Sequence, residues 1–90
     1  MDDKGHIRST AEEDAATERA VLQQVLALHP AQITLEELMR EVGEGGDGFA
    51  RRDAIERAVR DLAGAGLLRR SDSFVLPTRA ALHFNELLGE

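Results

Sequence analysis

The segment from 51 to 76 constrains the fold of this chain more than any other stretch, because it predicts a helix and a β-hairpin in immediate succession. Ile55, Val59 and Leu62 recur at the i, i+4, i+7 spacing of one helical face. Gly64 follows, with a second glycine two residues later, and glycine supplies the positive φ that commonly ends a helix. The helix is therefore expected to begin near residue 50 and to stop near residue 65.

A short hairpin is expected directly after this helix. The runs Leu67 to Arg70 and Phe74 to Leu76 are compatible with extended backbone, and the polar triplet Ser71-Asp72-Ser73 between them is typical of a tight turn. Phe74 is expected to pack in the core beneath the hairpin, because large aromatic side chains more often fill a core than form an exposed stacking surface.

The first half of the chain predicts two more helices. Thr10 followed by Glu13 is a capping-box pattern, and the helix that it starts is expected to run to about Leu28, before Pro30. Gln32-Ile33 is compatible with a brief extended segment.

The second and the last helices are shorter. Thr34 and Glu37 repeat the capping-box spacing, and Gly43 ends the helix that follows. Pro77-Thr78 begins the last helix, expected from Arg79 to about Leu88. On that helix one face carries Ala80, Phe84, Leu87 and Leu88.

The order helix, short strand, helix, helix, hairpin, helix resembles the winged helix-turn-helix family. Residues 33–43, ITLEELMREVG, are similar to its short strand and second helix, and residues 54–68, AIERAVRDLAGAGLL, are similar to its recognition helix entering the wing. The resemblance implies a mainly α fold with a small β-hairpin: a three-helix core, a short wing and a C-terminal helix. It also implies that the third helix, about 50–65, enters the major groove of double-stranded DNA.

Length and composition indicate one small domain. With 90 residues the chain is expected to form a single domain over 10–90, preceded by a flexible arm over 1–9. The absence of cysteine excludes disulfides and thiolate catalysis. No apolar run is long enough to cross a membrane and the start is polar, so a soluble cytoplasmic protein is expected.

Charge is divided unevenly along the chain. The net charge is −6, but residues 1–48 carry four basic and eleven acidic side chains, whereas residues 49–79 carry seven basic and four acidic ones. This distribution predicts an acidic front and a locally basic helix and hairpin suited to phosphates. Ordinary solvated surface charge is the alternative interpretation.

Six arginines of the basic part are candidates for DNA contact. Those on the third helix would reach guanine edges or phosphates, and those on the hairpin would reach phosphates. The candidates are Arg51, Arg52, Arg57, Arg60, Arg69 and Arg70. The alternative is pairing on the helix surface, because Asp53 and Arg57, Glu56 and Arg60, and Arg57 and Asp61 are each four residues apart.

The sequence contains no residue pattern that indicates an enzyme. His6, His29 and His83 have no metal-ligand spacing with one another. The glycine-rich stretch 43–48 follows a helix and carries two acidic residues, which would repel phosphate. We therefore expect no catalytic residue, no metal and no cofactor, and no small-molecule effector is evident.

Self-association is expected from the outer helices. The first helix is apolar on more sides than one core requires. On the last helix Leu82 lies opposite the face of Phe84 and Leu87. The residues predicted to form a homodimer interface through these two helices are Val21, Leu22, Leu26 and Leu82.

Together these patterns predict sequence-specific binding of double-stranded DNA by a small dimeric transcriptional regulator of bacterial type. The alternative is a winged-helix module that binds protein and not DNA, using the acidic first half or the surplus apolar surface of the first helix.

Overall fold

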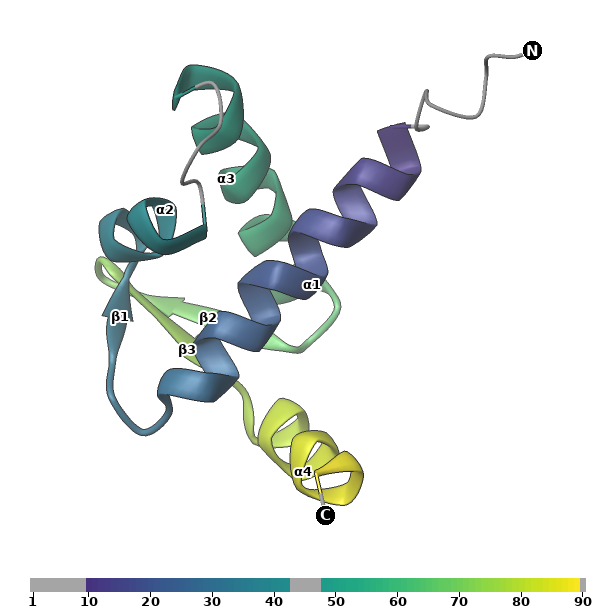
Figure 1. The fold of residues 1–90 in the computed structure, drawn as a ribbon. Helices are drawn as coiled ribbons and strands as arrows, with labels where there is room; N and C mark the ends of the chain where they lie inside the picture. Colours follow the sequence, from purple (N-terminus) through teal and green to yellow (C-terminus); the bar gives the residue numbers. More distant parts are fainter. Residues whose placement is uncertain (1–9, 43–47, 90) are drawn as a thin grey trace, which may run out of the picture.

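A computed structural model of the chain describes residues 10–42 and 48–89. Within these residues the fold is mainly helical, with four helices and a three-stranded antiparallel sheet (Figure 1). The elements are α1 (Thr10–Leu28), β1 (Ile33–Thr34), α2 (Leu35–Val42), α3 (Gly48–Gly64), β2 (Leu68–Ser71), β3 (Phe74–Pro77) and α4 (Arg79–Leu88). The predicted arm 1–9 and most of the glycine-rich link lie outside the described residues, as does the side chain of Thr10, on which the first capping box depends.

The predicted order of elements is confirmed, and α3 begins two residues earlier than expected. The second capping box is formed as predicted. The backbone N–H of Thr34 donates to Oε1 of Glu37 at 2.9 Å, and the backbone N–H of Glu37 donates to Oγ1 of Thr34 at 3.1 Å.

The sheet has the order β1-β3-β2, so the extended segment expected near residue 33 is a strand paired with the hairpin. Ile33 lies opposite Val75, and Leu68 lies opposite Pro77. Because directly opposed residues share a face of the sheet, Ile33, Val75 and Leu68 all point to the same side, and all three are buried. Phe74 is on the other side and is only half-buried, so its predicted place in the core is wrong.

One apolar core joins α1, α2, α3 and the inner face of the sheet. Its buried members are Val21, Val25, Ile33, Leu38, Met39, Ile55, Ala58, Val59, Leu62, Leu68 and Val75. The predicted helical face of α3 therefore packs inward as expected.

The turn from α3 to β2 depends on Gly66, whose φ is +85°. The backbone N–H of Leu67 donates to the carbonyl of Leu62 at 2.9 Å, which closes the end of α3. Thr78 connects this turn to α4: its Oγ1 donates to the carbonyl of Gly66 at 2.7 Å and accepts from the backbone N–H of Ala81 at 3.1 Å. Thr78 is thus the N-cap of α4 and also its anchor.

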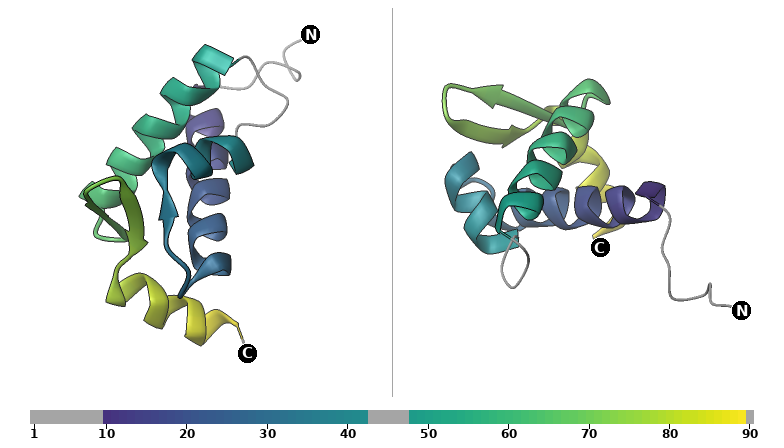
Figure 2. Two further views of the ribbon diagram at one scale, coloured as in Figure 1. Left: turned by 90° about the vertical axis from the view of Figure 1, so that its left-hand side faces the viewer. Right: turned by 90° about the horizontal axis from the view of Figure 1, so that it is seen from above.

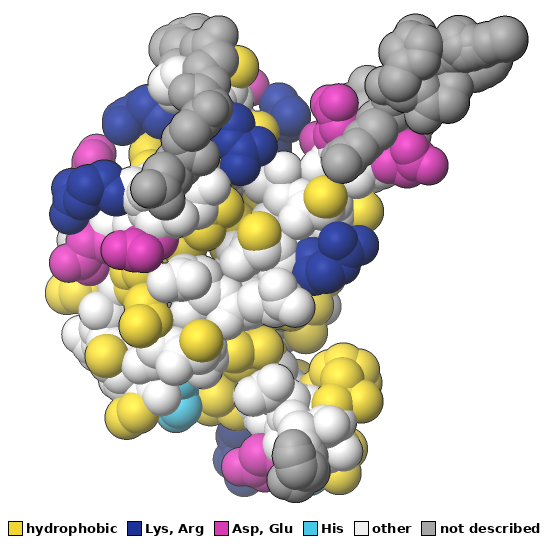
Figure 3. All heavy atoms as spheres, in the orientation of Figure 1, with side chains coloured by type: hydrophobic (Ala, Val, Ile, Leu, Met, Phe, Trp, Pro, Cys, Tyr) yellow, Lys and Arg dark blue, Asp and Glu magenta, His cyan; other side chains and the backbone are white. Residues whose placement is uncertain are grey.

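The orientation of α4 turns its larger apolar side chains away from the core. The helix lies at the end of the molecule opposite the start of α3 (Figures 1 and 2), and Ala81 is its one buried residue. Leu82 is half-buried, whereas Phe84, Leu87 and Leu88 are exposed. The face that carries Phe84, Leu87 and Leu88 is therefore open to solvent, because the bonds of Thr78 fix the start of the helix so that the Ala81 side turns inward. Figure 3 shows hydrophobic atoms open to solvent on this helix at the lower right.

Candidate functional site

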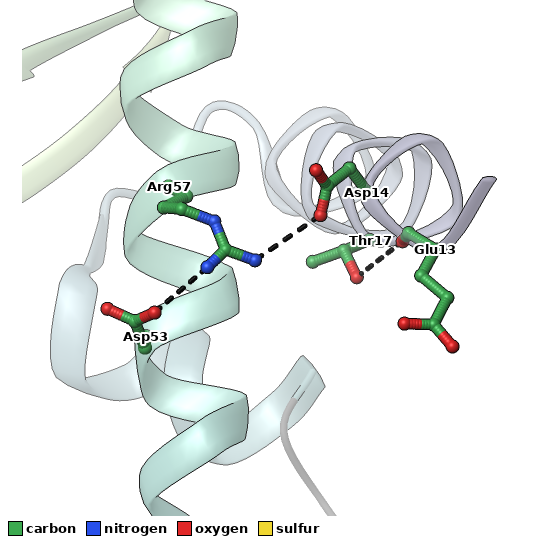
Figure 4. Close-up of polar contacts among 5 residues, drawn as sticks. All are labelled: Glu13, Asp14, Thr17, Asp53 and Arg57. Atoms are coloured by element: carbon green, nitrogen blue, oxygen red, sulfur yellow. Dashed lines mark hydrogen bonds and ion pairs between the residues drawn. The ribbon is translucent and has the colours of Figure 1, made fainter. Parts of the chain in front are cut away.

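Arg57 is a residue of α3, and its guanidinium lies between α3 and α1 with a carboxylate on each side (Figure 4). Its Nη1 is 2.9 Å from Oδ2 of Asp53 on the same helix, and its Nη2 is 3.3 Å from Oδ1 of Asp14 on α1. The Asp53–Arg57 pair expected from the sequence is therefore formed. The contact with Asp14 joins residues far apart in sequence and holds the guanidinium against α1, so Arg57 is not freely presented for reading bases.

Further carboxylates surround this contact. Burial raises the pKa of Glu18, with further contributions from the negative charge of Asp61, a hydrogen bond with the Asp61 side chain, and the charge of Asp14. Asp61 therefore faces Glu18 on α1, and the Arg57–Asp61 pair considered from the sequence is not among the ion pairs of the described residues. The seam between α1 and α3 has more carboxylates than Arg57 alone neutralises.

The two arginines at the start of α3 also have partners within the protein. Nη2 of Arg51 donates to the carbonyl of Val42 at 3.1 Å, which satisfies a free carbonyl at the end of α2. Nη2 of Arg52 is 3.7 Å from Oε2 of Glu36 on α2. The helix dipole disfavours positive charge at the start of a helix. The contacts with α2 stabilise both arginines there, so no external anion is needed to explain their position.

The other three candidates are exposed: Arg60 on α3, and Arg69 and Arg70 on β2. Over residues 10–42 and 48–89 none of them has an ion pair with a carboxylate, so the Glu56–Arg60 pair considered from the sequence is not formed. Arg70 lies opposite Val75, on the face of the sheet that packs toward the helices, and Arg69 lies opposite Leu76 on the other face. Arg70 is therefore the hairpin arginine that shares a side with α3.

The four residues predicted for a dimer interface differ in how far they are buried. Val21 is completely buried in the core, so it has no surface with which to contact a second copy, and its assignment to an interface is corrected. Leu22 packs partly against the same core, and Leu26 and Leu82 are half-buried. The periodicity of α1 identified apolar positions correctly but did not distinguish those that its own domain covers.

A groove of about 510 Å³ lies between the first halves of α1 and α3. Its lining is mixed, with four alanines, Thr17 and the charged side chains around Arg57. In the part of the chain that the structure describes, no three His, Cys, Asp or Glu side chains are arranged to hold a metal ion. The same part contains no helix with the length and apolar character needed to cross a membrane.

Comparison of the chain with models of protein families, with curated proteins and with solved structures gave no match.

Proposed function

We propose that this protein is a winged-helix module that binds double-stranded DNA mainly through the phosphate backbone, with Arg60 and Arg70 as the contacting cations. The order of the elements, and the sheet in which a short strand pairs with a hairpin after the third helix, support the winged-helix assignment. In this proposal α3 lies along the major groove and β2–β3 is the wing beside it.

The observation that carries the proposal is the division of the six candidate arginines. Arg51, Arg52 and Arg57 are held by α2 and by carboxylates, whereas Arg60, Arg69 and Arg70 are exposed without a carboxylate partner among the described residues. Releasing Arg57 to contact a base would break two ion pairs. Phosphate contacts position a protein on DNA but carry little sequence information, so weak sequence preference follows.

Alanine variants test the assignment at low salt on a mixed-sequence duplex. Arg60→Ala and Arg70→Ala should each weaken binding, whereas Arg69→Ala, on the other face of the hairpin, should have a smaller effect. Arg19→Ala is the matched control, since Arg19 is an exposed arginine on α1 and lies outside the proposed surface. Equal losses for Arg19→Ala, Arg60→Ala and Arg70→Ala would show that only net charge matters and would overturn the assignment.

A second candidate is a winged-helix module that binds protein and not DNA. The observation that favours it is the charge of the exposed α3 surface, where Arg52 and Arg60 are outnumbered by Asp53, Glu56 and Asp61. A surface of this composition repels phosphates more than it attracts them. Absence of any duplex binding at low salt would favour this candidate over the first.

A further inference from the structure

β2 leaves one edge of the sheet open. Among residues 10–42 and 48–89 it pairs only with β3, and the opposite edge is β1, a two-residue strand that leads directly into α2. In the right-hand view of Figure 2 the tip of the hairpin extends to one side of α3. Leu68 is buried at the base of β2, whereas the three residues that follow it are exposed. We call these residues, 69–71, the β2 edge.

The backbone of Arg70 faces outward from this edge. Leu68 lies opposite Pro77, which has no N–H to donate, so these two residues form a pair without mutual hydrogen bonds. Because hydrogen-bonded and non-hydrogen-bonded pairs alternate in an antiparallel ladder, Arg70 and Val75 also form a pair of the second kind. The N–H and C=O of Arg70 therefore point away from β3, and no other backbone group in the described part of the chain bonds to them.

We propose that the β2 edge binds an extended, acidic segment of another protein as a fourth, antiparallel strand of the sheet, with two consecutive carboxylates of that segment paired with Arg69 and Arg70.

The charges of the β2 edge indicate an acidic occupant. Arg69 and Arg70 are neighbours on a strand, so their side chains lie on opposite faces of the sheet. The residues of an added strand that lie opposite them are also neighbours, and they alternate between the faces in the same way. Two consecutive acidic residues would therefore place one carboxylate beside each guanidinium. Neither arginine has an ion pair with a carboxylate of the described residues, so both are available for this pairing.

Other occupants fit this edge less well. Two copies of the chain that paired through their β2 edges would bring four arginines together, and like charges across a strand pair are destabilising. A DNA duplex cannot continue the backbone ladder, and on the inner side of the hairpin it would reach Arg70 but not Arg69, which lies on the other face. An acidic strand uses both guanidinium groups and the outward backbone groups of Arg70.

Asp72 limits where the two acidic residues can lie. It is the only acidic residue of the segment 67–77, and it lies in the turn beside Ser71. A carboxylate opposite Ser71 would approach Asp72 and be repelled, whereas carboxylates opposite Arg69 and Arg70 lie farther from the turn. Because the added strand is antiparallel, its expected sequence is a neutral residue followed by two acidic ones.

Titration of the full chain with a synthetic peptide tests the proposal. The probe is acetyl-Thr-Val-Thr-Glu-Glu-Val-Thr-amide, and its control is a peptide of the same composition with one glutamate at each end. The probe should bind weakly, with Kd of about 0.1 to 1 mM, because one residue supplies the backbone hydrogen bonds and both ion pairs are exposed. The control peptide should bind several-fold more weakly. No binding of the probe at about 1 mM, or equal binding of the two peptides, would overturn the proposal.

Charge reversal tests the contribution of the outer arginine. Arg69→Glu should weaken binding of the probe about tenfold, because it replaces an attraction with a repulsion. Arg19→Glu is the matched control, since Arg19 is an exposed arginine on α1 and the change in net charge is the same. Equal losses for the two variants would show that only net charge attracts the peptide and would refute the assignment to the β2 edge.

Amide hydrogen exchange tests the strand pairing itself. In the free protein the N–H of Arg70 points to solvent, whereas the N–H of Arg69 points to β3. A saturating concentration of the probe should therefore slow exchange at Arg70 about tenfold and leave exchange at Arg69 nearly unchanged. Binding without protection of the Arg70 amide would mean that no strand is added and would overturn the proposal. These measurements contain no DNA, so their outcome is independent of the proposed duplex binding.

Discussion

Replacement of Arg57 by alanine separates a structural role from a DNA-contacting role. The structure gives this side chain two ion pairs, with Asp53 at 2.9 Å and Asp14 at 3.3 Å. We expect Arg57→Ala to lower the stability of the domain and to leave the affinity of the folded protein for DNA nearly unchanged.

The size of the stability loss follows from solvent exposure. The side chains of Arg57, Asp53 and Asp14 are 42%, 62% and 39% exposed, so solvent screens both pairs. Exposed ion pairs contribute about 0.2 to 1 kcal/mol each, and the carboxylates of Asp14, Glu18 and Asp61 would remain close together without their cation. We therefore expect a loss of about 1 kcal/mol in the free energy of unfolding, which in a domain of this size lowers Tm by about 4 to 8 °C.

Urea denaturation at low and high salt measures this effect, and a duplex titration on the same samples measures binding. The stability loss should shrink at high salt, because screening weakens exposed ion pairs. Arg60→Ala is the matched control and should show the opposite pattern, with weaker binding and unchanged stability. If Arg57→Ala weakens binding as much as Arg60→Ala while Tm is unaltered, the structural role assigned to Arg57 is refuted.

Three further changes test the fold around this surface. Thr78→Ala removes the N-cap of α4 and the hydrogen bond to the Gly66 carbonyl. It should lower the free energy of unfolding, measured by urea denaturation, by about 1 kcal/mol. Thr78→Ser keeps the hydroxyl and should retain most of this free energy. Gly66→Ala should lower the free energy of unfolding by about 1 to 2 kcal/mol, because φ is +85° there although a methyl group has space. Gly64→Ala is the control, since this glycine is helical and also has open space, and it should leave the free energy of unfolding unchanged. Equal effects of the two substitutions would contradict the reasoning. Glu18→Gln should raise stability at pH 7, because a raised carboxyl pKa means that the folded state loses stability as pH rises through the range between the unfolded and folded pKa values. Below about pH 4 the two proteins should converge, and a difference that is constant with pH would show that the Glu18 charge is not the cause.

Local patterns predicted the elements of this fold well. The capping box of Thr34 and Glu37, the glycine at the end of α3 and the short polar turn of the hairpin act over a few residues, so their consequences can be read from the sequence. The register that brings Ile33 beside Val75 depends on residues far apart in the chain, and local patterns predicted only a brief extended segment there.

The surface was less predictable, for two physical reasons. Periodicity identified the apolar stripe of α4, but the side of a helix that faces the core depends on how the helix is attached, which Thr78 determines through bonds to the α3–β2 turn. Spacing identified Asp53 as a partner of Arg57, but Asp14 comes from another helix, and no local pattern predicts that contact. The sequence therefore predicted the candidate arginines as a set, but their division into held and exposed groups depends on contacts between helices.

The salt dependence of duplex binding is the most direct test of the proposed phosphate contacts. The logarithm of the binding constant should fall with the logarithm of salt concentration with a slope of about −1.8 per copy for two phosphate contacts, and the double variant with Arg60→Ala and Arg70→Ala should show almost no slope. A slope that the double variant retains, or no binding by the parent protein at low salt, would contradict the proposal.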